Sequence, residues 1–103
     1  MTFMPEKILL NLDKKLKKLI PGFLENREKE LIEINSAINS RKYEKLNDIG
    51  HQLKGSAGSY GFMTLSQLGG DLEEAGKEKN IQKAKLVVEK ISDHLKHLEI
   101  DFD

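Results

Sequence analysis

Apolar residues recur every three or four positions through most of the chain, which is the spacing of one face of an α-helix. The longest such stripe lies in the C-terminal segment, and Asn80 directly before it has the side chain of a helix N-cap. The stripe predicts a helix that runs from Ile81 through Phe102. Its members are Ile81, Ala84, Val88, Ile91, Leu95, Leu98 and Phe102.

Three more stripes with the same spacing predict three more helices. Their members are Leu24, Leu31, Ile34 and Ile38; then Leu46, Ile49, Leu53, Ala57 and Tyr60; then Leu65, Leu68, Leu72 and Ala75. A leucine series ahead of Pro21 predicts an additional short N-terminal helix, and it comprises Leu9, Leu12, Leu16 and Leu19. No segment alternates polar and apolar residues with a strand-like composition, so we expect no sheet.

The signals at the helix ends fit this division of the chain. Gly61 is placed to end the central helix in a left-handed conformation. Thr64 and Gln67 fit a capping box, with Met63 and Leu68 as its hydrophobic staple. Short polar connections between amphipathic helices favour antiparallel neighbours. We therefore predict an all-α protein, an antiparallel up-down four-helix bundle with an additional short N-terminal helix, in a single domain over residues 1–103.

Composition narrows the classes of function. Lys plus Arg equals Asp plus Glu at 17 each, so the charge balance gives no sign of a nucleic-acid or anionic-membrane partner. The chain has no cysteine, which excludes disulfides and thiolate zinc sites. It also has no apolar stretch of signal-peptide or membrane-span length. We expect a soluble cytoplasmic protein that binds neither nucleic acid nor membrane.

Two charged clusters have simple interpretations. The first helix carries the basic cluster Lys14, Lys15, Lys17 and Lys18, which could lie on a membrane surface but fits a solvated helix face better. His94 and His97 have a spacing that can share a metal ion, but no third ligand is evident nearby. We therefore expect these histidines at the surface or its boundary, and no metal site.

The central helix carries a histidine on its outward face. His51 lies two residues after the core position Ile49, about 200° round the helix, so it faces solvent. The positions that share its face are Asn47, Lys54, Gly55 and Gly58. A glycine inside a helix lowers stability by about 1 kcal/mol relative to alanine, so the presence of Gly55 and Gly58 in this helix requires an explanation. We assign them to the close approach of another molecule, and Gly50, which points elsewhere, to helix packing.

This arrangement suits phosphoryl transfer. A neutral imidazole is a good nucleophile near neutral pH, and phosphorylation then adds about two negative charges to the helix surface. We expect His51 to be the phosphoacceptor, Lys54 to stabilise the phosphate charge and Gly55 to leave steric access. Nearby residues expected to contact a partner are Asn47, Gln52, Gly58 and Ser59.

The segment resembles the phosphorylation motif of histidine-containing phosphotransfer (HPt) domains, which reads His-x-Leu-Lys-Gly-Ser/Ala-Ala with a glycine further on. The matching residues are His51, Leu53, Lys54, Gly55, Ser56, Ala57 and Gly61. The resemblance extends over residues 19–98, through Pro21–Arg27 and through Phe62, Leu65, Leu68, Leu72 and Glu73. Lys42 occupies a position before the central helix that is often acidic in the family, and this difference weakens the helix cap expected there.

The resemblance implies a role in a multistep two-component phosphorelay. His51 would accept a phosphoryl group from the aspartyl-phosphate of one receiver domain and pass it to another. The implied partners are receiver domains of response regulators or of hybrid sensor histidine kinases, and the Mg²⁺ ion would belong to the receiver. The chain would have no cofactor of its own and would act as a carrier rather than an enzyme. We also expect it to be a monomer.

Three alternatives remain open. The phosphorylation domain of a chemotaxis-type kinase shares the His-x-x-Lys-Gly core, but it would need a catalytic domain downstream of Asp103. A helical protein-binding module would have no phosphate chemistry, so His51 would fail to accept phosphate. A metal-binding bundle would take up zinc stoichiometrically. The sequence does not identify the donor, the acceptor or the direction of phosphate flow.

Overall fold

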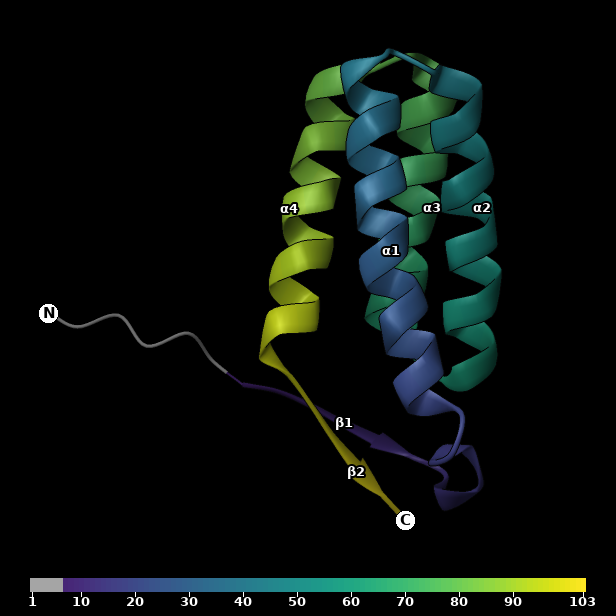
Figure 1. Ribbon diagram of the computed structural model, residues 1–103, viewed down its shortest axis with the longest axis vertical. Helices are drawn as coiled ribbons and strands as arrows, with labels where there is room; N and C mark the ends of the chain where they lie inside the picture. The colour runs from purple at the N-terminus through teal and green to yellow at the C-terminus, as the bar shows by residue number, and fades with distance from the viewer. Residues whose placement is uncertain (1–6) are drawn as a thin grey trace, which may run out of the picture.

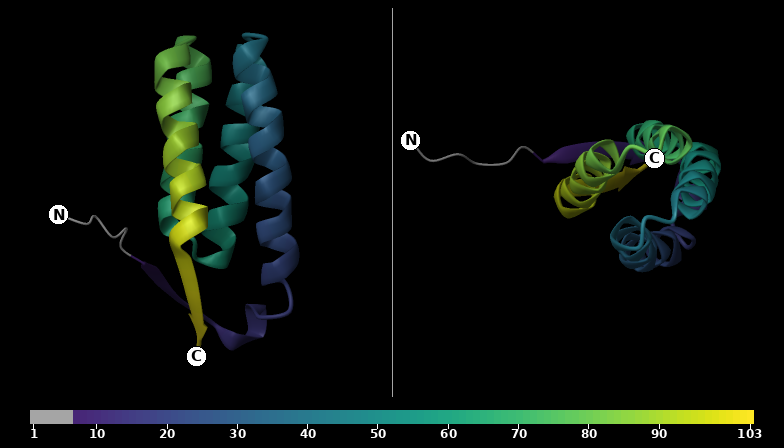
Figure 2. Two further views of the ribbon diagram at one scale, coloured as in Figure 1. Left: turned by 60° about the vertical axis from the view of Figure 1, so that its left-hand side comes forward. Right: turned by 90° about the horizontal axis from the view of Figure 1, so that it is seen from above.

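The computed structural model describes residues 7–103, and most of them lie in helices. The helices are α1 (Ile20–Asn39), α2 (Tyr43–Tyr60), α3 (Met63–Glu78) and α4 (Ile81–His97), which stand side by side as a bundle (Figure 1). Successive helices are neighbours, and α4 also contacts α1, as the view from above shows (Figure 2). Within the described residues, no helix is both long and apolar enough to cross a bilayer. The prediction of four helices is confirmed.

The apolar stripes meet in a shared core. Eight of the predicted stripe residues are at most 1 % exposed, and they are Ile34, Leu46, Leu53, Ala57, Leu65, Leu72, Ala75 and Ala84. Phe62 fills the end of the core where α2 turns into α3, and its ring stacks on Phe23 with centroids 4.6 Å apart. Burial of these side chains, rather than helix propensity, holds the helices together.

The helix ends follow the sequence signals in part. The Asn80 side chain accepts the N–H of Lys83 at 3.0 Å, and Gly61 has a φ of 90°, so both predicted caps are confirmed. The capping box is wrong, because α3 begins at Met63 and Thr64 lies inside its first turn without a capping hydrogen bond. Burial of Phe62 fixes this earlier start, since the chain turns at Gly61 and the helix follows directly.

A sheet replaces the predicted N-terminal helix. Strand β1 (Ile8–Leu12) pairs in parallel with β2 (Leu98–Phe102). From residue 7 to the start of α1, the described chain forms no helix except a single 3-10 turn, η1 (Lys14–Leu16). The predictions of a helix through Leu9–Leu19, of an α4 that reaches Phe102 and of no sheet are therefore wrong. Exposure alternates from residue to residue in both strands, and Leu98–Phe102 also alternates apolar and acidic residues, so the statement that no segment alternates is wrong for this segment. Pairing between the two segments fixes both as strands.

The sheet lies beyond one end of the bundle, where α4 ends and α1 begins (Figures 1 and 2). Leu12 anchors it and is 5 % exposed, with its side chain close to Gly61 at the adjoining end of α2. The Lys14 N–H donates to the Asp103 carbonyl at 3.2 Å, and the Asp103 N–H donates to the Leu12 carbonyl at 3.0 Å. The lysines of the basic cluster are exposed around η1, as expected of solvated side chains.

The two C-terminal histidines differ in environment. His94 is 7 % exposed, so the expectation of a surface position is wrong for this residue, whereas His97 is only partly buried. His94 lies where α4 meets α3 and β1, beside Leu68 and Ile8. Burial lowers the pKa of its imidazole below the usual 6.5. In the described residues, no group of three potential ligands is placed to hold a metal ion.

Burial of His94 should make the stability of the fold depend on pH. The unfolded chain binds a proton at this residue near its usual pKa while the folded chain does not, so stability should fall as the pH drops below about 6.5. Replacing His94 with Leu should reduce the loss of stability between about pH 7.5 and pH 5.5, measured by urea unfolding. His97→Asn is the matched control and should keep the parental pH dependence. An unchanged pH dependence in His94→Leu would contradict this assignment.

Candidate functional site

Helices α2 and α3 approach so closely that their backbones nearly touch. A Cβ added at Gly50 would lie 2.3 Å from the Glu73 amide nitrogen, and one at Gly69 would lie 2.6 Å from the Lys54 nitrogen. A Cβ at Gly76 would lie 2.6 Å from the Asn47 nitrogen. The glycines therefore permit this packing, as expected for Gly50. The close approach brings side chains of α3 within reach of His51.

His51 is held by a carboxylate from α3. Its side chain is 73 % exposed, yet its Nδ1 lies 2.8 Å from Oε2 of Glu73, whose side chain is only 16 % exposed. The hydrogen bond with His51 lowers the pKa of the Glu73 carboxyl, although partial desolvation opposes this. An ionised carboxylate can only accept, so Nδ1 carries the proton and donates. In the neutral imidazole, this contact leaves the lone pair on the other ring nitrogen, Nε2.

Lys54 extends the pair of His51 and Glu73 into a triad on the surface. Its Nζ lies 4.0 Å from Oε1 of Glu73, and its side chain is 57 % exposed. An ion pair of this length in solvent contributes little and leaves the ammonium free to move. Lys54 can therefore turn toward a phosphoryl group on the neighbouring imidazole. It would act as a flexible point charge rather than as a rigid two-pronged donor.

Hydrogen bonds between the two helices hold Glu73 in place. The Asn47 side-chain amide donates to the Glu73 carbonyl at 3.1 Å, and the Ser66 hydroxyl donates to the Lys54 carbonyl at 2.8 Å. Asn47 was expected to contact a partner, but the structure places its amide in this tie between helices. The Asn47 amide therefore helps to hold α3, and with it Glu73, against α2, and its contact with a partner stays a prediction.

The remaining expected site residues divide into two groups. Nothing lies within 4 Å of a Cβ added at Gly55, so this position is open to an approaching molecule. Gln52 and Ser59 are exposed on the same helix, although the Ser59 hydroxyl donates to the Gly55 carbonyl at 2.9 Å. A Cβ at Gly58 would lie 3.3 Å from the Ser66 hydroxyl oxygen. Gly58 is therefore half-buried beside α3, and its contact with a partner stays a prediction.

On the other side of α2, a buried arginine supports the motif. Arg27 of α1 is 9 % exposed, and its NH1 donates to the Ser56 hydroxyl at 3.0 Å. Its Nε lies 3.2 Å from Oε1 of Glu30, and its guanidinium lies over the Phe23 ring. These contacts fix α1 against the face of α2 that lies behind the exposed histidine.

Sequence reasoning assigned no role to Glu73. It was noted only as a residue of the segment after the motif, and no local spacing connects it with His51 on another helix. One signal was available, because Gly69 and Gly76 lie seven residues apart on one face of α3. Glycines at that spacing indicate a close helix partner. With Gly50 opposite them, they would have placed α3 against α2.

Comparison with known families agrees with this geometry. The family model described as "Hpt domain" matches residues 18–100. The chain belongs to the Hpt domain family. The match spans all four helices of this Hpt domain and leaves β1 outside. Neither the search of curated proteins nor the search of solved structures found a match.

The contact between His51 and Glu73 gives the first test of the site. Glu73→Gln removes the ionised acceptor and so should convert the His51 ring from the Nδ1–H form to a mixture of tautomers, visible in its ¹⁵N NMR shifts. Phosphoryl acceptance should slow by roughly tenfold to a hundredfold, because the ring is no longer held in one orientation. Glu74→Gln is the control, since the Glu74 carboxylate is 59 % exposed and pairs with Lys83 instead. An unchanged tautomer in Glu73→Gln would rule out this role.

Proposed function

We propose that this Hpt domain is the phosphotransfer protein of a multistep two-component phosphorelay. His51 accepts a phosphoryl group from the aspartyl-phosphate of a receiver domain and passes it to a second receiver. The observation that carries the proposal is an exposed imidazole whose Nδ1 is held by Glu73 while Gly55 leaves its surroundings open. The proposal includes an antiparallel bundle, supported by the opposite order of the contacts Asn47–Gly76, Gly50–Glu73 and Lys54–Gly69.

The transfer step follows from the protonation of the ring. The Nε2 lone pair attacks phosphorus, the new P–N bond forms as the P–O bond to the receiver aspartate breaks, and the aspartate leaves as a carboxylate. The ring becomes positively charged, and the Glu73 carboxylate on Nδ1 compensates that charge. Lys54 is placed to balance part of the phosphoryl charge. The same groups serve the reverse step onto a second receiver.

The chain would act as a carrier, with the chemistry completed by its partner. The receiver supplies the acidic pocket and the Mg²⁺ ion, so we propose no cofactor for this chain and no catalysis by it alone. The partners are receiver domains of response regulators or of hybrid sensor histidine kinases, which places the relay in the cytoplasm. Transfer then depends on positioning and charge compensation rather than on a protein-bound catalyst.

The surface around His51 suits a transient contact. On α3, Met63, Ser66 and Gly70 follow one side of the helix beside the part of α2 that carries Lys54, as the contacts of Ser66 and Gly70 with that lysine show. Ser66 and Gly70 are small, so they do not protrude between His51 and an approaching partner. Met63, at the N-terminal end of α3, is 64 % exposed. A flexible, apolar methionine can adapt to different partners. The interface should therefore be small and readily released.

Label transfer from phosphorylated receivers tests the proposal directly. Candidate receivers carrying ³²P on their aspartate are mixed with the chain, and label should move to the chain and then to a second, unlabelled receiver. A module that only binds proteins would associate with a receiver without taking up label. The phosphorylation domain of a chemotaxis-type kinase would instead take label from ATP in the presence of a kinase catalytic domain, and not from receivers.

Steric access at Gly55 can be tested apart from stability. Gly55→Gln should slow phosphoryl transfer by about tenfold or more, because the new side chain occupies the open space one turn from His51. Stability should rise slightly, by up to about 1 kcal/mol, because glutamine favours the helix more than glycine does. Lys45→Gln is the control on the same helix, because Lys45 is exposed and has no assigned part in the site, and it should transfer at nearly the parental rate. Parental transfer by Gly55→Gln would show that no molecule approaches closely there.

A further inference from the structure

The small sheet is the part of the molecule that the phosphotransfer site does not use. In the described residues, β1 and β2 pair only with each other, in parallel. Parallel sheets are usually larger and covered on both faces, and isolated strand pairs are only marginally stable. Each strand of such a pair also leaves backbone N–H and C=O groups on its outer edge without strand partners. An uncovered pair of this kind is therefore suited to accept another strand.

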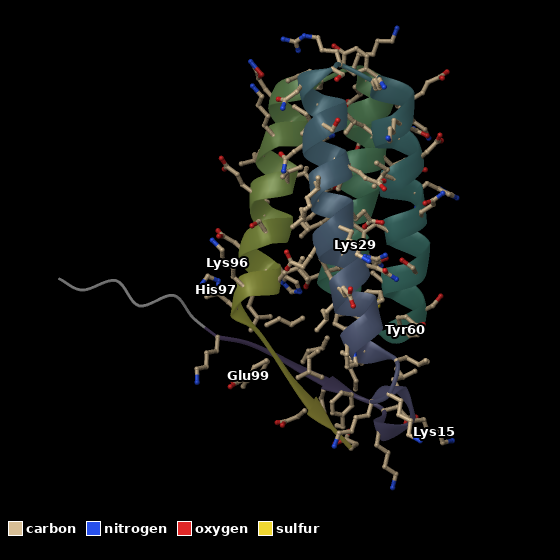
Figure 3. All side chains as sticks on the ribbon, in the orientation of Figure 1. Lys15, Lys29, Tyr60, Lys96, His97 and Glu99 are labelled. Carbon is tan, nitrogen blue, oxygen red and sulfur yellow. The ribbon has the colours of Figure 1, made fainter. Side chains whose placement is uncertain are left out.

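The two outer edges differ in their charge. Strand β2 carries Glu99 and Asp101 on its exposed face, and Figure 3 shows Glu99 on this strand below the bundle. Strand β1 carries no charged residue from Ile8 to Leu12, and its Leu9 is 73 % exposed. Charged side chains are a common protection of an edge strand against pairing with other chains. Strand β1 lacks that protection.

We propose that β1 pairs with β1 of a second copy of this chain, antiparallel and centred on Leu10. In this register Leu10 lies opposite Leu10 of the other copy, and the other pairs are Ile8 with Leu12, Leu9 with Asn11 and Lys7 with Asp13. The sequence is self-complementary, since apolar residues of one face meet apolar residues and each end pairs a lysine with an aspartate. Asp13 has extended backbone angles, φ −62° and ψ 130°, which suit continued pairing.

The same arrangement through β2 would be unfavourable. Centred on Ile100, it would place Glu99 opposite Asp101 of the other copy twice, and like charges directly opposite destabilise strand pairs. Pairing through β1 instead joins the half-buried Ile8 and Leu10 of one copy to the same apolar face of the other. The two sheets become one continuous sheet in the order β2–β1–β1–β2.

The dimer leaves both phosphotransfer sites open. His51 lies near the middle of α2, and the sheet lies beyond the end of that helix (Figure 1). The proposal is therefore independent of the proposed function. It replaces the expectation of a monomer. Because the paired segments are short, the association should be weak and depend on concentration.

Sedimentation equilibrium of the whole chain up to about 1 mM should show a monomer–dimer equilibrium. Lys7→Glu puts like charges opposite each other at both ends and should weaken the dimer by roughly tenfold. Asp13→Lys should do the same, and the double variant Lys7→Glu with Asp13→Lys should restore it, because the pairs are exchanged. Lys7→Glu also removes the ion pair between Lys7 and Glu99 within one copy. Both side chains are exposed, so this loss should have little effect on the stability of the sheet.

Disulfide trapping gives a second, independent readout. The chain has no cysteine, so Leu10→Cys should oxidise to a covalent dimer across the symmetry axis. Asp101→Cys on β2 is the matched control and should stay monomeric under the same conditions. A chain that remains monomeric at all concentrations, a dimer trapped through position 101, or a dimer unaffected by Lys7→Glu would each overturn the proposal. Label transfer to His51 in Lys7→Glu should remain parental, which separates this test from that of the proposed function.

Discussion

Replacing His51 with Gln should abolish phosphoryl acceptance without unfolding the bundle. The imidazole is 73 % exposed and contacts Glu73 only at its edge, so its loss removes no core packing. The variant should take no measurable label from a phosphorylated receiver, while its circular dichroism and melting temperature stay near those of the parent. Surface substitutions of this kind usually change stability by less than about 0.5 kcal/mol.

The chemistry of the label gives a further check on the same residue. A phosphoryl group on a ring nitrogen is a phosphoramidate, so label on the parent should be lost in acid and retained in base. Acid-stable label would indicate a hydroxyl such as that of Ser59. His97→Gln is the control, because it removes another partly exposed histidine and should leave acceptance unchanged. Label that persists in His51→Gln would refute the assignment of the phosphoacceptor.

A large loss of stability is expected from adding one methyl group at Gly69. An alanine Cβ there would lie 2.6 Å from the Lys54 nitrogen and 2.9 Å from the Gly50 carbonyl oxygen. Both neighbours are backbone atoms, so the clash is relieved only if α3 moves away from α2. Gly69→Ala should therefore lower the free energy of unfolding by about 3 kcal/mol. This is a large part of the roughly 5–15 kcal/mol of a typical small domain.

The same substitution at Gly55 is the matched control and should have the opposite sign. No atom lies within 4 Å of its added Cβ, so Gly55→Ala should stabilise the helix by up to about 1 kcal/mol. Urea unfolding at a single pH measures both variants. Movement of α3 should also carry Glu73 away from His51, so Gly69→Ala should transfer phosphate more slowly wherever it remains folded. Equal stability of the two variants would mean that the helices are not packed as closely as described.

The helices and the outward position of His51 could be predicted because their signals are local. A helix face repeats every three to four residues, so the core positions of α2 and the outward direction of His51 can both be read from one short segment. The openness at Gly55 follows from the same geometry. Caps such as Asn80 and Gly61 are equally local, because each acts on a helix end within a few residues.

Sequence reasoning was incomplete where a residue depends on a distant partner. Gly58 and Gly55 look alike in the sequence, but Ser66 of α3 lies against one and nothing lies against the other. His94 has the spacing of a boundary residue, but it is buried where α3 packs against α4, and Ile8 of β1 lines the same hollow. Such differences are set by the packing of neighbouring elements, which a helical wheel of one segment does not contain.

By itself, the sequence determined the four helices, their buried faces and the exposed histidine with its lysine and glycine. Only the tertiary structure decided that Glu73 holds Nδ1 of His51, that Asn47 serves the helix pair and that the two ends of the chain form a sheet. Short segments such as Ile8–Leu12 and Leu98–Phe102 fit both the helical and the strand period. Both segments form strands because the fold brings them side by side, and their backbones can then pair with each other.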